Sequence, residues 1–179
     1  MRLSKNFTLN EFNFRGLPLD DDLLANAKVL SNNLQSIRDF LGKPIKVTSW
    51  YRPTTINRNV KGSKTSQHLY GEAVDFEVIG LDSDGLDDLF NLLVTNQIKL
   101  PNACSQIIRE TDEKGNNWIH LAIKTNRWLD AQKDILNNPN NNSMSKSKAS
   151  KRLTHCEYLV TKDTINFEMI KYIPYGDFG

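Results

Sequence analysis

The middle of the chain contains the stretch Ser66-Gln67-His68-Leu69-Tyr70-Gly71-Glu72-Ala73-Val74-Asp75-Phe76-Glu77-Val78. From Glu72 onward the residues alternate as in a β-strand, whose successive side chains point to opposite faces. The side chains that we expect to face the core are Val74, Phe76 and Val78. Asp75 then projects from the opposite face. His68 lies in the loop that leads into this strand, where Gly71 permits a tight turn.

A second strand, predicted at Asn117 to Lys124, repeats this arrangement. Its apolar face consists of Ile119, Leu121 and Ile123, so His120 projects from the other side together with Trp118 and Ala122. If the two strands pair in one sheet, Asp75 and His120 share a surface, with His68 at its edge. Two imidazoles and one carboxylate are a suitable catalytic zinc set, because they leave a fourth position for water. The third histidine, His155, beside Cys156, is an alternative ligand.

The remaining patterns predict an α+β domain, in which helices pack on one face of a small, mainly antiparallel sheet and the metal cleft lies on the other. A long helix follows the triplet at 20–22 and stops at Gly42, with an apolar stripe of Leu24, Ala27, Leu30, Leu34, Ile37 and Phe40. Pro44 to Trp50 alternates like a strand, and a loop-rich stretch extends from Tyr51 to Gly71. Further expected elements are a helix capped by Ser83 or Asp84, a strand from Cys104 to Glu110, a hairpin connection at 112–116 and a short helix after Trp128.

The composition changes after residue 136. Residues 137–152 are rich in Asn, Ser and Lys and have almost no apolar content, which predicts a flexible linker. Apolar character returns at 153–179. We therefore expect a zinc-binding domain at 1–136, the linker at 137–152 and a small C-terminal extension at 153–179.

Charge and cysteine content exclude several classes of protein. The 179 residues include 23 basic and 21 acidic side chains, a net charge of +2 that gives no reason to expect nucleic-acid binding. Cys104 and Cys156 fit neither a disulfide framework nor a CxxC zinc site, which favours two free thiols in a reducing cytoplasm. No apolar run is long enough to span a bilayer, and the N-terminus lacks the hydrophobic segment of a signal peptide.

Several motifs together resemble the D-alanyl-D-alanine carboxypeptidase family of zinc peptidases, which also includes vancomycin-resistance dipeptidases and phage endolysins that cut peptidoglycan stem peptides. The central motif is Val47-Thr48-Ser49-Trp50-Tyr51-Arg52-Pro53, then Asn57, then the stretch from Gly62 to Phe76. Trp118-Ile119-His120-Leu121 is similar to the family's second metal motif. Asn6-Phe7-Thr8-Leu9-Asn10-Glu11-Phe12 resembles the opening of its phage-borne members. The resemblance spans roughly residues 4 to 125 and implies a DD-peptidase/hedgehog-like fold.

The resemblance also implies roles for individual residues. The family's zinc ligands fall on His68, Asp75 and His120, and its substrate-binding arginine falls on Arg52. Ser66 and Gln67, beside the first ligand, bind substrate or orient the ligand, or else cap the loop. Many members place a catalytic carboxylate where this chain has Asn117, which cannot accept a proton. Glu110, across the predicted hairpin, is the expected general base, with Asp112 and Glu113 as alternatives.

The function implied by the resemblance is that of a zinc-dependent peptidase with one Zn²⁺ per chain, acting on peptidoglycan stem peptides as a D-Ala carboxypeptidase or as an endolysin-type endopeptidase. A phage-encoded enzyme without a signal peptide is expected in the cytoplasm of the infected host cell or in the phage particle. It would then need phage particle proteins or a holin to reach the cell wall, without membrane insertion of its own. The alternative is a non-catalytic phage structural or cell-wall-binding protein with the same fold. A nucleic-acid-binding segment at Lys146 to Arg152 is the weakest possibility.

Overall fold

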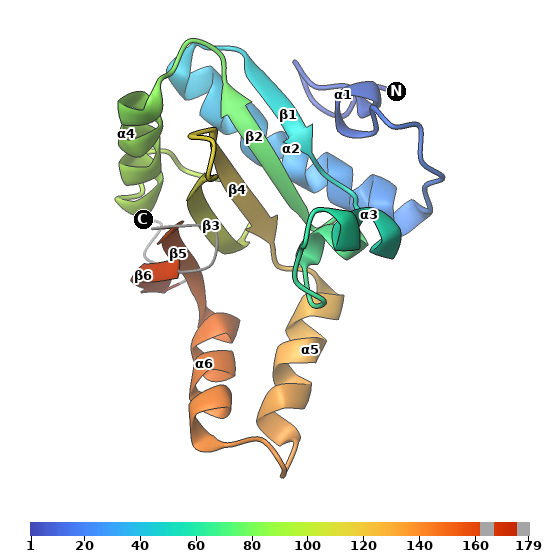
Figure 1. Cartoon of the computed structure of the whole chain (residues 1–179), viewed down its shortest axis with the longest axis vertical. Helices are drawn as coiled ribbons and strands as arrows, with labels where there is room; N and C mark the ends of the chain where they lie inside the picture. The colour runs from blue at the N-terminus through green and yellow to red at the C-terminus, as the bar shows by residue number, and fades with distance from the viewer. Residues whose placement is uncertain (162–166, 175–179) are drawn as a thin grey trace.

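A computed structural model describes residues 1–161 and 167–174 of the chain. Within them, one sheet has the strand order β1-β2-β4-β3-β5-β6 (Figure 1). Neighbouring strands are antiparallel except β3 and β5, so the predicted mainly antiparallel sheet is confirmed. The strands are β1 Ile45–Ser49, β2 Ala73–Val78, β3 Cys104–Thr111, β4 Asn117–Ile123, β5 His155–Thr161 and β6 Phe167–Pro174.

Seven helical segments occur in the described residues: α1 Leu9–Phe12, α2 Asp21–Leu41, α3 Thr54–Asn59, the 3-10 helix η1 Gln67–Tyr70, α4 Ser83–Val94, α5 Asn126–Asn137 and α6 Ser143–Thr154. The prediction of a loop-rich stretch between Tyr51 and Gly71 was incomplete, because α3 and η1 lie there. The helix expected after residue 82 is present, but its N-cap is Asp82, whose side chain accepts a hydrogen bond from the Gly85 N–H.

Helix α2 packs against the sheet and forms much of the core. It begins after Asp20, whose side chain accepts a hydrogen bond from the Leu23 N–H, and ends at Gly42, which has a left-handed φ of 63°. Its buried apolar side chains are Leu23, Ala27, Leu30, Leu34 and Ile37. The predicted stripe was wrong at both ends, since Leu24 is only half-buried and Phe40 is 54% exposed. Burial of each large side chain contributes about 1.5–3 kcal/mol.

The two central strands place their alternate side chains as predicted. Val74, Phe76, Ile119 and Leu121 are fully buried in the same core cluster as the α2 side chains. In the antiparallel register of β2 and β4, Asp75 lies directly opposite His120. The apolar face of this strand pair therefore holds it on α2, while the other face presents Asp75 and His120 as neighbours.

The C-terminal part differs from the expected linker. Residues 143–154 form α6, which lies beside α5, and the next residues form β5 on the edge of β3 (Figure 1). Basic side chains that we expected in solvent instead surround the buried Glu157: Arg152 Nη2 lies 2.9 Å and Lys148 Nζ 3.7 Å from its carboxylate. These ion pairs and the packing of α6 beside α5 (Figure 1) hold this segment on the rest of the described structure. The domain boundaries at 136 and 152 remain a prediction, and residues 162–166 and 175–179 of the extension lie outside the described residues.

Cys104 and Cys156 are both buried, and no disulfide joins them in the described part of the chain. Burial raises the pKa of the Cys104 thiol to about 12. None of the described helices is long and apolar enough to cross a membrane.

Candidate metal centre

The turn that carries His68 is held by the segment that follows β1. The Trp50 indole N–H donates to the Gly71 carbonyl at 2.8 Å, and the Arg52 N–H donates to the His68 carbonyl at 2.9 Å. Gly71 ends η1 with a φ of 62°, and a Cβ at this position would lie 2.6 Å from the Leu23 side chain. Only glycine therefore fits both the backbone conformation and the available space.

The orientation of the His68 ring is determined by a main-chain acceptor. His68 Nδ1 lies 2.6 Å from the Trp50 carbonyl oxygen. Because a carbonyl can only accept, Nδ1 carries the proton and Nε2 of the neutral ring keeps its lone pair. A hydrogen bond of this kind orients many histidine ligands of metals.

The free nitrogen of His68 points to the two other predicted ligands. His68 Nε2 lies 3.1 Å from Asp75 Oδ1 and 3.2 Å from His120 Nδ1, and His120 Nδ1 lies 2.8 Å from Asp75 Oδ1. One ligand atom from each residue lies within 4.8 Å of the others. Two nitrogens and one oxygen, brought together from η1, β2 and β4, are a donor set that fits a zinc ion with one position left open.

The protonation states also suit a metal. Burial alone would raise the pKa of Asp75, but the neighbouring His68 and His120 rings outweigh burial and hold this pKa well below its usual value. Burial lowers the pKa of His68, although Asp75 opposes the shift. An ionised carboxylate and a neutral imidazole are the forms that bind metal.

Glu110 and Arg52 lie next to this cluster. Glu110 Oε1 is 4.0 Å from His120 Nδ1, and Arg52 Nη1 is 3.7 Å from Asp75 Oδ2. Burial raises the pKa of Glu110, with Asp75 adding to the effect and His120 and Arg52 opposing it. Burial also lowers the pKa of Arg52, whose Nε is buried without a hydrogen-bond partner in the described structure. The structure thus brings five predicted residues together.

Other predicted residues lie elsewhere or use their polar groups within the protein. The Gln67 amide donates to the Ile123 carbonyl and accepts from the Ser105 hydroxyl, both at 2.8 Å. Ser66 Oγ accepts from the His68 N–H at 3.4 Å. Both side chains therefore tie the His68 turn to its surroundings.

The alternative carboxylates do not add to the centre. Asn117 bonds to Thr111 and to the Gly115 carbonyl at the end of the hairpin. Asp112 accepts hydrogen bonds from the main chain of Lys114 and Asn116, as a turn residue does. Glu113 is an exposed residue of the same turn. The side chain of His155 lies outside the described residues.

Sequence reasoning missed one buried polar network beside the centre. Glu72, only 1% exposed, accepts hydrogen bonds from the Thr125 hydroxyl and from the Arg127 guanidinium, whose Nε lies 2.7 Å away. The Arg127 guanidinium also lies 3.6 Å from the centre of the Tyr70 ring. This network joins the end of η1 to the start of α5. Nothing local in the sequence marks it, because its members are 55 positions apart.

Comparisons with known proteins agree with this geometry. A family model described as Peptidase M15 matches residues 5–122. A zinc D-Ala-D-Ala carboxypeptidase from Streptomyces albus G is 44% identical over 62 residues, which are 34% of this chain and 23% of that protein. The matched part of the chain thus spans about a quarter of the length of this relative.

Proposed function

This chain belongs to the peptidase M15 family, and on that basis we propose that it is a zinc-dependent peptidase acting on peptidoglycan stem peptides. The observation that carries the proposal is the convergence of His68 Nε2, Asp75 Oδ1 and His120 Nδ1, with a buried carboxylate and a buried guanidinium beside them. The name of the zinc D-Ala-D-Ala carboxypeptidase relative supports the choice of metal and of substrate class.

The proposed ligands are His68, Asp75 and His120, which hold one Zn²⁺ per chain. When bound there, the ion supplies a Lewis acid that polarises a scissile carbonyl and lowers the pKa of water. The chain's own contribution begins with orientation. The Trp50 carbonyl fixes the His68 ring, and Gln67 and Ser66 hold the turn on which it lies.

Glu110 is the proposed general base. It takes a proton from the attacking water onto its carboxylate and passes it to the leaving amine nitrogen. A raised pKa suits this role, because a carboxylate whose pKa is closer to neutrality takes up the water proton more readily and can still pass it to the leaving amine.

Arg52 is the proposed anchor for a substrate carboxylate. A guanidinium forms two parallel hydrogen bonds to a carboxylate, which fixes the peptide as well as binding it. The buried Nε of Arg52 has no partner within the described structure, so a donor is available for such a ligand.

We further propose that the reaction is that of a D-Ala carboxypeptidase or of an endolysin-type endopeptidase. The resemblance of residues 6–12 to phage-borne members supports a phage origin. The enzyme would then act on the cell wall from the infected host cell or the phage particle, aided by a holin or by particle proteins. A non-catalytic cell-wall-binding protein is the second candidate, favoured by Asn117 at the position where many members have a catalytic carboxylate.

Mass spectrometry of purified peptidoglycan fragments tests the proposal. The zinc-loaded chain is compared with a chelator-treated sample and with zinc-loaded Glu110→Gln. Loss of a terminal alanine identifies a carboxypeptidase, and an internal cut identifies an endopeptidase. Absence of a zinc-dependent product from protein shown to contain zinc would refute the peptidase and favour the binding protein.

A further inference from the structure

The outer edge of β1 borders an open groove. β1 is the first strand of the sheet and pairs with β2 alone, so its other edge faces away from the sheet. The groove has a volume of about 510 Å³ and is lined by Glu11, Phe14, Ile45, Lys46, Val47 and Thr48. Four consecutive strand residues line it although their side chains alternate between faces, so the groove follows the strand edge.

Main-chain groups of β1 face this groove. The Pro44 carbonyl accepts a hydrogen bond from the Ile79 N–H at 2.9 Å. Bonded and non-bonded residues alternate in an antiparallel pair, so Lys46 is the next residue of β1 that bonds to β2. The N–H and C=O groups of Ile45 and Val47 therefore point outward. Among the described residues, none outside β2 forms a main-chain hydrogen bond with either of them.

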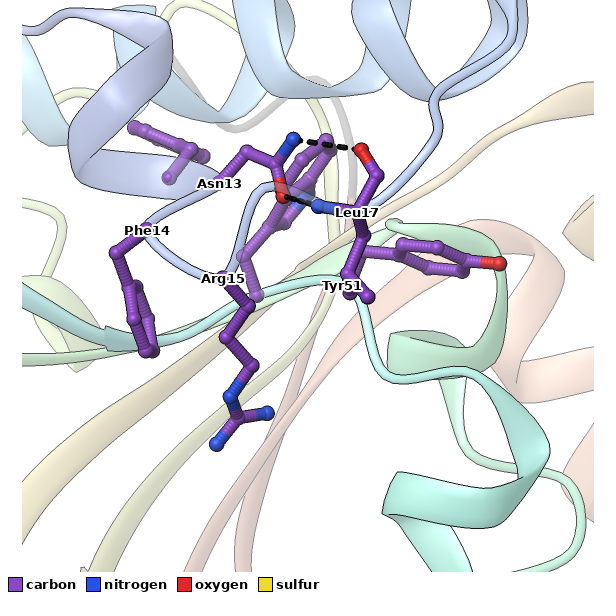
Figure 2. A pocket seen from close by; sticks show the side chains of 7 residues that line it. Asn13, Phe14, Arg15, Leu17 and Tyr51 are labelled. Atoms are coloured by element: carbon purple, nitrogen blue, oxygen red, sulfur yellow. Dashed lines mark hydrogen bonds between the residues drawn. The ribbon is translucent and has the colours of Figure 1, made fainter.

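A short loop forms the opposite wall. The Asn13 side chain closes this loop, since its amide donates to the Leu17 carbonyl at 2.8 Å and accepts from the Leu17 N–H at 2.9 Å (Figure 2). The loop holds Phe14, which is 53% exposed, against the groove. Arg15 extends from the same loop near Tyr51, is exposed, and has no ion-pair partner among the described residues (Figure 2).

The groove leads toward the metal centre. β1 ends at Ser49, which is paired with Asp75, and the next residues of the chain include Arg52. Arg15 lines a hollow together with Trp50 and Tyr51, which directly precede Arg52 in the chain. A chain lying along β1 would therefore meet Arg15 just past the end of the strand, on the side where Ser49 is paired with Asp75.

We propose that this edge groove binds an extended acidic peptide as an additional strand on β1, with a carboxylate of the peptide at Arg15. The outward main-chain groups of Ile45 and Val47 select an extended backbone, as in other cases of strand addition. Phe14 offers an apolar contact, and Arg15 a charge-assisted hydrogen bond. The inference rests on the proposed peptidase function, because it assigns the groove to the substrate of that site.

Peptide binding tests the strand addition. The probe is a fluorescent pentapeptide with one internal glutamate and two terminal D-alanines, and its dissociation constant is measured by anisotropy on the full chain, zinc-loaded and chelator-treated. In a series of singly N-methylated probes, methylation of nitrogens that face β1 should weaken binding about tenfold, because each loses one hydrogen bond. Methylation of the intervening nitrogens should change it less than about twofold. The same loss at every position, or no loss at any, would overturn the proposal.

Arg15 is tested with a charge-matched pair of probes. Replacing the internal glutamate by glutamine should weaken binding to the wild-type chain about fivefold. The same replacement should have no effect on Arg15→Ala. Lys28→Ala, which removes an exposed positive charge from α2, is the control and should respond as the wild type does. Equal sensitivity in Arg15→Ala and the wild type would remove Arg15 from the site.

A protein-side variant adds an independent measurement. Val47→Pro removes an N–H that faces the groove and not β2, a position where an edge strand tolerates proline. It should keep its cooperative unfolding and lose about tenfold in affinity; if it does not fold, the N-methylated series still decides. If the probe is hydrolysed but neither the N-methylated series nor Val47→Pro shows the expected loss of affinity, the groove is refuted and the peptidase function is retained. Alternating N-methyl effects without a zinc-dependent product would support the groove and refute the peptidase.

Discussion

His68 Nδ1 is hydrogen-bonded to the main-chain carbonyl of Trp50 at 2.6 Å, while the Trp50 indole bonds to the carbonyl of Gly71 on the far side of the same turn. One tryptophan therefore holds both ends of the turn that carries His68. The orientation of this proposed ligand depends on a residue that is not itself among the proposed ligands.

Trp50→Phe should weaken metal binding although it removes no ligand. The variant keeps an aromatic side chain but loses the indole N–H that donates to the Gly71 carbonyl. Leaving this buried carbonyl without a partner costs about 1–3 kcal/mol. Mutation of a residue that orients a metal ligand typically lowers metal affinity about 10–100-fold. Zinc competition with a chromophoric chelator measures the affinity, and Trp128→Phe is the matched control in α5. Equal affinities in the two variants would contradict the orienting role.

Asp75→Asn should abolish stoichiometric zinc binding. The lowered pKa of Asp75 keeps its carboxylate ionised, which is the form that binds a metal ion. The neutral amide of asparagine carries no such negative charge. Elemental analysis after gel filtration gives the zinc content. Glu77→Gln is the control, because Glu77 lies two residues along the same strand and forms an exposed ion pair with Lys46. One zinc per chain in Asp75→Asn would exclude Asp75 as a ligand.

Glu110→Gln should keep its zinc and lose about 10²–10⁴ in kcat, the usual contribution of a general base. The amide has nearly the shape of the carboxylate but cannot take up the proton. Steady-state hydrolysis of a stem-peptide substrate measures the effect, and Glu113→Gln in the hairpin turn is the control. Near-normal turnover in Glu110→Gln would exclude it as the base.

Cys104 should make the folded state sensitive to alkaline pH. Its pKa rises from 9.0 in the unfolded chain to about 12 in the fold, so the folded state holds the thiol proton more tightly. The resulting stabilisation is fully present below pH 9 and is lost as the pH rises toward 12. Urea unfolding of the wild type and of Cys104→Ala at pH 8 and pH 10.5 should show a larger loss of stability in the wild type. Parallel losses would contradict the assignment.

The juxtaposition of Asp75 and His120 was predictable because it depends on alternation within two strands. Val74 and Phe76 on β2, with Ile119 and Leu121 on β4, determine which face is buried and hence where Asp75 and His120 point. The α3 and η1 segments were not predictable from local pattern. η1 is held by Trp50 and Gly71, and its side-chain anchors lie as far away as Ile123.

Helix α6 was missed for a related reason. Its sequence is rich in Ser and Lys and offers Ala149 as its buried apolar residue among those described, so no amphipathic period marks it. Its contacts are with α5, beside which it lies (Figure 1), and with Glu157 on the next strand, which forms ion pairs with Lys148 and Arg152. The hydrophobic pattern of residues 143–154 does not reveal contacts with residues that only the folded chain brings near.

The position of β5 beside β3 has a consequence for anyone who shortens this protein. A fragment ending at residue 136, where the composition suggests a domain boundary, would keep every proposed ligand but leave one edge of β3 unpaired. Unpaired strand edges pair with other chains and promote aggregation. The segment that contains β5 thus covers the edge of β3, and we expect the shortened protein to aggregate before its activity can be measured.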